Sequence, residues 1–461
     1  MPNCSLYRYV APLAALWLAG CAVYSARPLP DKTDLAPKVP DLKVDVQTLH
    51  LPGLAPHAYD PAKGLDMTDA AILAVINNPG LRTARQEAHA ARAQSFAAGL
   101  LPGPQLTGSR DKPASGNSTP GLVTGKSVGL DYDLGALLTS GAEKGAAEAQ
   151  AQQADLDLLW EEWQVAQEAR VLFLQCRGDR EKLALLGDLK QTMQTRYDAE
   201  HTVLKSGDVA LDTLSVDLAA LQDVQSRADA LAQDENESCR ALNTLLGLAP
   251  EVRLELLAPE PPGEIAAQEI EAALKELPKR RPDLVALQYG YQAQDEEVRR
   301  AVLAQFPSIG LGINRASDTS GVRTNGFSLS LSFPFLFGGP SEVHAAEAGR
   351  DALWQAYQQR LDETEGEVRT AATDLGILQA ELDKLKASEP DAEAVSQSAA
   401  KAYARGDLTA PAYYDLSIAG INRRIEGLDL EAQVQQFHLG LTTLLGLPPE
   451  DLKHPVDEDS P

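Results

Sequence analysis

Two runs of alternating apolar and polar residues in the second half of the chain predict β-strands. In residues 308–314, isoleucine and leucine alternate with serine, glycine and asparagine, and in residues 327–333, phenylalanine and leucine alternate with serine. A period of two places the apolar side chains on one face of a strand and the polar ones on the other. The polar face of the second run carries Ser328, Ser330 and Ser332.

The first half of the chain predicts a matching strand pair. Residues 127–134 alternate in the same way, with Asp131 and Asp133 on the polar side, and residues 105–110 form a weaker run. We therefore expect four strands in the chain, in two pairs.

Long helical patterns follow both strand pairs. Residues 137–204 contain no proline and would span about 100 Å as one helix, which is typical of a coiled coil. Residues 341–404 form a similar pattern, with a kink expected at Pro390. Both end in a Gly-Asp pair (Gly207-Asp208 and Gly406-Asp407), read as helix terminator and N-cap of the next helix. Two antiparallel helical hairpins result.

The seam of the first hairpin is predicted from near-heptad spacing of apolar residues. One side of this seam contains Leu211, Leu214, Leu218 and Leu221, and the other contains Leu156, Leu159, Trp163, Ala166, Phe173 and Cys176.

The chain is also an internal repeat. Residues 244–251 (TLLGLAPE) recur as residues 443–450 (TLLGLPPE), and further matches occur at the same offset of about 200 residues. The expected organisation is a signal peptide at 1–20, a lipid anchor and extended tether at 21–64, a first repeat at 65–250, an equatorial linker at 251–280, a second repeat at 281–450 and an acidic tail at 451–461.

The N-terminus predicts export and lipidation. Arg8 precedes a short apolar run at residues 11–18, too short to span a bilayer. Leu18-Ala19-Gly20-Cys21 resembles the bacterial lipobox, whose cysteine is acylated after cleavage. Ala22 follows in place of an inner-membrane retention Asp, so we expect an outer-membrane lipoprotein; the alternative is an ordinary secreted protein with a coincidental cysteine.

Composition and charge narrow the function further. A net charge of −25 argues against nucleic-acid binding. Seven His, three Met and no Cys pair at metal spacing predict no metal site, and neither a phosphate-binding loop nor a nucleophile–base pair is evident. We expect neither a cofactor nor an enzymatic activity.

Four amphipathic strands require partners. Single-chain membrane barrels begin at eight strands, and open sheet edges are not tolerated in lipid. If the apolar faces contact lipid, the strands must therefore pair between copies of the chain, and cyclic symmetry is the natural closure.

This pattern resembles the TolC-like outer-membrane efflux protein family, especially the lipid-anchored members that serve RND-type pumps. The resemblance covers about residues 65–450 and rests on the order of its motifs and on their double occurrence. These motifs are the lipobox, Asn78-Pro79-Gly80-Leu81 with Arg85, Arg281-Pro282-Asp283-Leu284, Phe306-Pro307-Ser308, residues 333–339 (FPFLFGG), the two hairpin turns and both Leu-Leu-Gly-Leu ends. The chain departs from the family in its weak first strand and in Leu101-Pro102-Gly103-Pro104, where an aromatic-Pro break is usual.

The resemblance implies a mainly α-helical fold with a membrane β-barrel portion. Long antiparallel hairpins would form an α-barrel, and four strands per chain would complete a twelve-stranded barrel in a homotrimer. The implied function is a passive outer-membrane duct of a tripartite efflux pump that exports small molecules or ions. Its partners would be a periplasmic adaptor, an inner-membrane pump and outer-membrane lipid. A periplasmic adaptor lipoprotein and a lipid-anchored helical enzyme or scaffold are the alternatives.

Candidate site residues lie at the hairpin turns and on the strands. Asp208 and Asp407 either form carboxylate rings around the periplasmic mouth or only cap helices. Tyr403, Arg405 and Asp407 are expected to help hold the resting mouth shut. Asp131 and Asp133 either make the lumen selective for cations or only hydrate it. Cys176 and Cys239, at matching distances from the first turn, either form a disulfide or are two small core cysteines.

Overall fold

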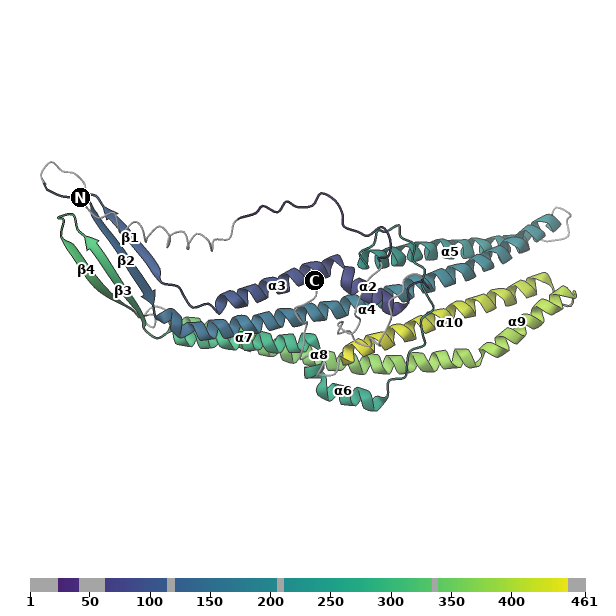
Figure 1. The fold of residues 1–461 in the computed structure, drawn as a ribbon. Helices are drawn as coiled ribbons and strands as arrows, with labels where there is room; N and C mark the ends of the chain where they lie inside the picture. The colour runs from purple at the N-terminus through teal and green to yellow at the C-terminus, as the bar shows by residue number, and fades with distance from the viewer. Residues whose placement is uncertain (1–23, 41–62, 114–120, 205–210, 334–338, 447–461) are drawn as a thin grey trace. The chain divides into compact units, whose positions relative to one another are not determined.

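The computed structural model describes residues 24–40, 63–113, 121–204, 211–333 and 339–446 (Figure 1). The chain divides into a first unit, residues 1–35, and a second, residues 36–461. Residues 24–35 contain no helix or strand, so every described helix and strand belongs to the second unit. The two predicted repeats therefore lie together in that one compact unit.

The first repeat runs helix, helix, strand, strand, helix, helix. Its elements are α2 (Met67–Asn77), α3 (Pro79–Ala98), β1 (Gln105–Asp111), β2 (Gly125–Asp133), α4 (Gly135–Leu204) and α5 (Leu211–Leu245). Asp66 begins α2 with a capping box, since its carboxylate accepts the amides of Thr68 and Asp69 while Asp69 accepts the amide of Asp66. Asn78 caps α3 before a proline at the first helical position, where the missing amide costs nothing.

The second repeat follows the same order. Its elements are α6 (Ala267–Arg280), α7 (Pro282–Ala304), β3 (Ser308–Ser317), β4 (Arg323–Ser332), α8 (Gly339–Ala387), α9 (Glu389–Ala404) and α10 (Ala410–Leu445). α6 lies inside the segment predicted as linker. The interruption between α8 and α9 falls at Ser388, immediately before the expected kink at Pro390. We call α4 with α5 hairpin 1, and α8 with α9 and α10 hairpin 2.

The four strands form one antiparallel sheet in the order β1-β2-β3-β4. The two predicted pairs are joined because β2 pairs with β3, with Leu130 opposite Ile313 and Asp131 opposite Gly312. Figure 1 shows the four strands side by side, with α4 leaving the sheet directly after β2. The sheet thus ties the first repeat to the second.

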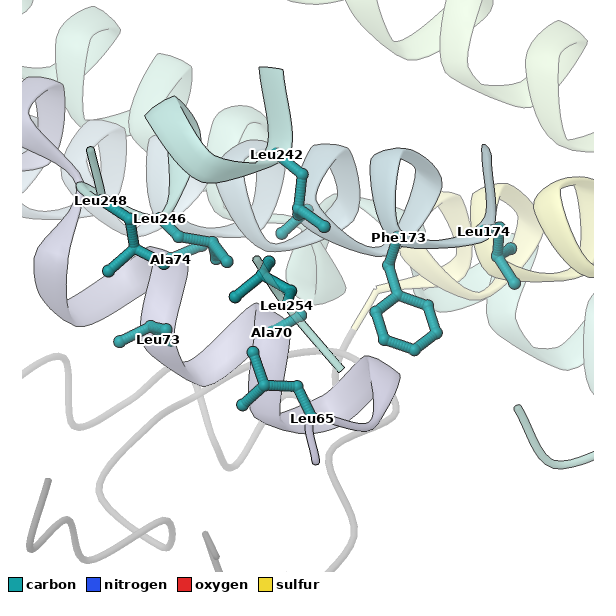
Figure 2. Close-up of a cluster of buried hydrophobic side chains, with 11 residues drawn as sticks. Leu65, Ala70, Leu73, Ala74, Phe173, Leu174, Leu242, Leu246, Leu248 and Leu254 are labelled. Atoms are coloured by element: carbon teal, nitrogen blue, oxygen red, sulfur yellow. The ribbon is translucent and has the colours of Figure 1, made fainter. Parts of the chain in front are cut away.

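A core cluster packs the middle of α4 and the C-terminal end of α5 against α2. Phe173 of α4, Leu242 and Leu246 meet Leu65 and Leu73 there, and each of these side chains is at most 2% exposed (Figure 2). Burying such side chains contributes about 1.5–3 kcal/mol each.

The repeated Leu-Leu-Gly-Leu motif has a structural cause. Gly247 has φ +67° and Gly446 has φ +77°, a backbone region that side chains other than glycine rarely adopt. A Cβ atom at Gly247 would lie 2.6 Å from the carbonyl oxygen of Asn77, and one at Gly446 would lie 2.4 Å from that of Arg280. In each repeat this glycine lets the chain pass the C-terminal end of the preceding short helix, α2 or α6.

The predicted seam of hairpin 1 is wrong in two places. Leu159, Trp163 and Ala166 pack against α2 and α3 instead of α5, because α5 ends at Leu245 and does not extend that far along α4. Leu218 is 37% exposed, while Val224 is buried against α4.

Candidate functional site

The sheet exposes a continuous apolar face. The register aligns Leu106, Leu130, Ile313 and Phe327 across all four strands. These side chains are between 43% and 75% exposed, and Leu329 and Leu331 beside them are also exposed. Such a contiguous apolar patch on a sheet marks a surface that another apolar phase or another chain covers.

The opposite face of the sheet is polar and closely packed. Asp131 accepts a hydrogen bond from the hydroxyl of Thr107, 3.0 Å away. Asp131 and Ser328 both reach over Gly312, where a Cβ atom would lie 2.2 Å and 2.3 Å from their oxygens. Ser330 likewise covers Gly310, and Ser332 pairs with Ser308. Glycine on this face therefore makes room for the neighbouring polar side chains.

Asp133 has a second role at the end of β2. Its carboxylate accepts the amide of Gly135, 2.8 Å away, at the first residue of α4. This contact starts the long helix next to the polar face.

The turn of hairpin 2 places three candidate residues together. Gly406 has a φ of +79°. The amide of Gly406 donates to the carbonyl of Tyr403, and the amide of Asp407 donates to the carbonyl of Ala402. These two hydrogen bonds form a Schellman motif at the C-terminal end of α9. Arg405 and Asp407 form an exposed ion pair of 3.0 Å. Asp407 was predicted to cap the next helix, but Thr409 is the N-cap of α10. The prediction is wrong because α10 begins only at Ala410, so Asp407 does not stand at the N-cap position, and its carboxylate pairs with Arg405.

Tyr403 stacks on Tyr413 across this turn, with ring centroids 4.5 Å apart and planes within 3°. Tyr414 lies tilted against both rings. The end of α9 and the start of α10 are therefore joined by three aromatic side chains.

Three other candidates, Cys21, Gly207 and Asp208, lie outside the described residues. Cys176 and Cys239 lie inside them and form a disulfide between α4 and α5, with Cα atoms 4.8 Å apart. Cys176 is fully buried.

The structure also contains a buried ion cluster around Arg281 and Asp283, whose ion pairing the sequence analysis did not predict. Arg281 is 0% exposed, makes two hydrogen bonds to Asp283 and lies over the ring of Trp160. Asp283 accepts a further hydrogen bond from Arg360 of α8. Burial would raise the pKa of Asp283, but the bonds and charges of Arg281 and Arg360 outweigh it and hold that pKa below 3.8. Only the Arg281-Pro282-Asp283 string gave a signal in the sequence.

Membrane helices and metal clusters are not found in the part of the chain that the structure describes. No helix there combines the length and the apolar character needed to cross a membrane. Nor does any group of three or more His, Cys, Asp or Glu there have an arrangement fit for a metal ion.

One family model matches the chain: residues 273–447 match the family described as "Outer membrane efflux protein". The match runs from within α6 to the end of α10 and so covers the second repeat. No curated protein matches the sequence.

Solved structures match nearly the whole chain. The outer-membrane channel OprN is 19% identical, with a TM-score of 0.70 over 93% of this chain and 100% of that one. The Campylobacter jejuni CmeC outer membrane channel is 17% identical, with a TM-score of 0.68 over 92% and 95% of the two chains. The open state of the Neisseria gonorrhoeae MtrE outer membrane channel is 20% identical, with a TM-score of 0.64 over 83% and 89%. The expected fold, long helices with a four-stranded antiparallel sheet, is confirmed.

Proposed function

We propose that this chain is a member of the outer membrane efflux protein family, whose model matches residues 273–447, and that it is the outer-membrane channel subunit of a tripartite efflux pump. The observation that carries the proposal is the sheet, whose apolar face is exposed on all four strands and whose other face is polar. The family is a transport family without enzymatic activity. The match of residues 273–447 to this family favours a channel subunit over the alternative of a periplasmic adaptor lipoprotein.

A trimer would complete the membrane part of the channel. β1 and β4 are the edge strands of the sheet, and edges must be paired in lipid. Three copies joined β1 to β4 would give the twelve-stranded barrel expected from the sequence. Its apolar face would meet lipid, and Asp131, Asp133, Ser328, Ser330 and Ser332 would line the lumen.

The helical hairpins would continue this duct across the periplasm. α4 alone has 70 residues, about 100 Å of helix. The turns of both hairpins would then meet a periplasmic adaptor and an inner-membrane pump, here proposed to be of the RND type. The duct itself is passive, since the pump supplies the energy.

The N-terminal cysteine is proposed to carry lipid. Cleavage before Cys21 and acylation of its thiol would anchor the mature chain in the outer membrane in addition to the strands. Mass spectrometry of the N-terminal peptide should then show acyl chains on Cys21, and replacement of Cys21 by Ala should remove them without abolishing outer-membrane insertion.

The decisive test measures mass and conductance on the same preparation. Protein extracted by detergent from outer-membrane fractions should be a trimer and should conduct ions in a planar bilayer. Replacing Leu329 by Asp on the apolar face should prevent stable membrane insertion, because a charge facing lipid is costly. Replacing Ser332 by Asp on the polar face is the matched control and should be tolerated, because Ser332 lies opposite Ser308 and not beside a carboxylate. A monomer released by cleaving only the lipid anchor would refute the proposal.

A further inference from the structure

Each of the four strands carries one basic residue, and all four of these residues lie on the apolar side of the sheet. Each stands an even number of positions from the residue that its strand contributes to the aligned apolar row, and such side chains share a face of the strand. We call this set the basic girdle; it consists of Arg110 of β1, Lys126 of β2, Arg315 of β3 and Arg323 of β4.

The acidic residues of the strands lie on the opposite side. They are Asp111, Asp131 and Asp133, and the register places all three on the polar face. Asp111 accepts a hydrogen bond there from the hydroxyl of Ser109, and Asp131 accepts one from Thr107. In the described strands, positive and negative charges are therefore separated across the sheet. In a chain with a net charge of −25, four basic residues on one face indicate a function for that face.

The basic girdle lies at one end of the strands. Arg110 is opposite Lys126 near the β1–β2 connection, and Arg323 is opposite Ser317 near the β3–β4 connection. Ser317 also pairs with Lys126, so three girdle residues share one row across the sheet, with Arg315 two positions further in. The helices α7 and α4 adjoin the sheet at the other end, where the apolar side of the described strands carries no charged residue.

The cations of the basic girdle are exposed and have no anionic partner in the described part of the chain. None of the four side chains makes a hydrogen bond or an ion pair with a residue that the structure describes. Asp318, in the nearby β3–β4 turn, uses its carboxylate to accept the amides of Ser320 and Val322 and thereby closes the turn. The girdle is thus free to meet an anion from outside the chain.

The pairing of Arg110 with Lys126 itself favours such an anion. The Cβ atoms of residues directly opposite in an antiparallel ladder are about 5 Å apart, and like charges placed there destabilise the pair. An anion bound between the two side chains turns this repulsion into attraction. Arginine favours phosphate in particular, because its planar guanidinium donates two parallel hydrogen bonds to two phosphate oxygens.

The depth of the basic girdle matches the headgroup level of a membrane. A strand tilted by about 40° rises about 2.5 Å per residue. The ten positions from the exposed Phe333 to Arg323 therefore rise about 25 Å, which is the height of the apolar band of a membrane barrel. A charge facing lipid costs little at the edge of that band, where the long side chains of Lys and Arg reach the headgroups.

We propose that the basic girdle binds phosphate-bearing lipid headgroups in the outer leaflet of the membrane. The choice of leaflet rests on the proposed function: if the helices extend into the periplasm, the end of the sheet away from them faces the cell exterior. The acyl chains of the bound lipid would lie on the apolar row of Leu106, Leu130, Ile313 and Phe327. A trimer would repeat this site around the whole barrel.

Lipid binding to the full-length protein in a neutral detergent tests the proposal. Native mass spectrometry counts the lipids that remain bound to the protein. Phosphatidic acid, whose headgroup is a phosphomonoester, should bind about tenfold more tightly than phosphatidylcholine with the same acyl chains. Equal affinities for the two lipids would overturn the proposal.

Replacing the four girdle residues by Gln should abolish this preference. The matched control replaces four exposed cations of the helices by Gln and so changes the net charge equally; these are Lys275, Lys384, Lys401 and Arg424. The control should keep the preference for phosphatidic acid. A girdle variant that keeps it, or a control that loses it, would contradict the assignment to the girdle.

The single variant Lys126→Glu covers the case in which the fourfold variant does not fold. The new carboxylate would face Arg110 across the ladder and stabilise the strand pair while it occupies a phosphate-binding cation. The preference for phosphatidic acid should then fall severalfold without a loss of thermal stability. An unchanged preference in this variant would count against the proposal.

Inorganic phosphate distinguishes a lipid site from a site for the free anion. A large excess of inorganic phosphate should not displace phosphatidic acid, because the free anion lacks the acyl chains that contact the apolar row. Complete displacement would refute the assignment to a lipid.

Conductance recorded on the same samples separates this inference from the proposed function. A conducting trimer without a preference for phosphatidic acid refutes the lipid site and leaves the channel standing. A girdle-dependent preference in a protein that does not conduct supports the lipid site and refutes the channel.

Discussion

Single glycines govern how each repeat closes on itself. Gly247 and Gly446 combine a positive φ with a close approach to a backbone carbonyl, so two separate effects oppose any side chain there. Strain of this kind costs on the order of 1–3 kcal/mol. The clash with an unyielding backbone atom adds to it.

Replacement of Gly247 by Ala should therefore lower the thermal unfolding midpoint of the detergent-solubilised protein. The expected loss in the free energy of unfolding is about 2 kcal/mol. Gly263→Ala is the control, because no atom lies within 4 Å of a Cβ built there and its φ is not positive. Equal midpoints for the two variants would refute this account of the motif.

Some residue roles could be predicted from local sequence and others could not. Gly406 was predicted to end a helix because a positive φ at that place has a strong sequence signal. Asp407 was predicted to cap the next helix, but its carboxylate forms an ion pair with Arg405. An aspartate directly after a glycine is compatible with either role. The choice between them depends on side-chain positions that the order of residues does not reveal.

At the scale of helices, the link between α7 and α8 rests on Asp283. The carboxylate of Asp283 accepts hydrogen bonds from the buried Arg281, at the N-terminal end of α7, and from Arg360 of α8. Removing one member of a buried pair leaves the other charged and unsatisfied, which costs several kcal/mol.

Asp283→Asn should lower the free energy of unfolding by about 3 kcal/mol at pH 7. Asp295→Asn is the matched control: Asp295 also bonds from α7 to α8, through Arg350, but is 56% exposed, and its loss should not be measurable. Chemical denaturation of the three proteins compares them directly. Equal losses for both variants would show that burial does not set the strength of these pairs.

The ion pairs of Asp283 also predict how acid changes the stability of the protein. The pKa of Asp283 is lowered in the folded protein, so its stabilisation is present above about pH 4 and is lost as the pH falls through that lowered value. The difference in stability between the wild type and Asp283→Asn should therefore shrink below pH 4. A difference that stays constant down to pH 2 would contradict the assignment.

At the scale of the whole molecule, the turn of hairpin 2 is proposed to help close the resting channel. Arg405 and Asp407 form the polar pair at the turn, and Tyr403 is stacked beside them. Replacing both Arg405 and Asp407 by Ala should raise the leak conductance of trimers in planar bilayers. The pair Lys386 and Glu431, of similar exposure in the same hairpin, is the control, and its removal should leave the leak unchanged. An unchanged leak in the first variant would refute the role of this turn.

The order of elements could be predicted because each has a local signal. The alternation of apolar and polar residues predicted β2, β3 and β4, and long helical patterns without proline predicted α4 and α8. The helix α6 was missed because its proline- and glutamate-rich surroundings resemble a linker. The ion pair between Arg196 of α4 and Asp415 of α10 gave no signal in the sequence, because the two residues are 219 positions apart and meet only after both hairpins have packed.

The pairing of β2 with β3 also bears on how the chain reaches its final state. Even the paired residues nearest in sequence, 133 and 310, are separated by the whole of hairpin 1, whereas each helical hairpin closes over a much shorter stretch of chain. Contacts between distant residues form late in folding because closing a long loop loses more chain entropy. The hairpins should thus be assembled while the strands are still separate, and the apolar side chains of the strands would stay exposed to water until the sheet is complete and has entered lipid.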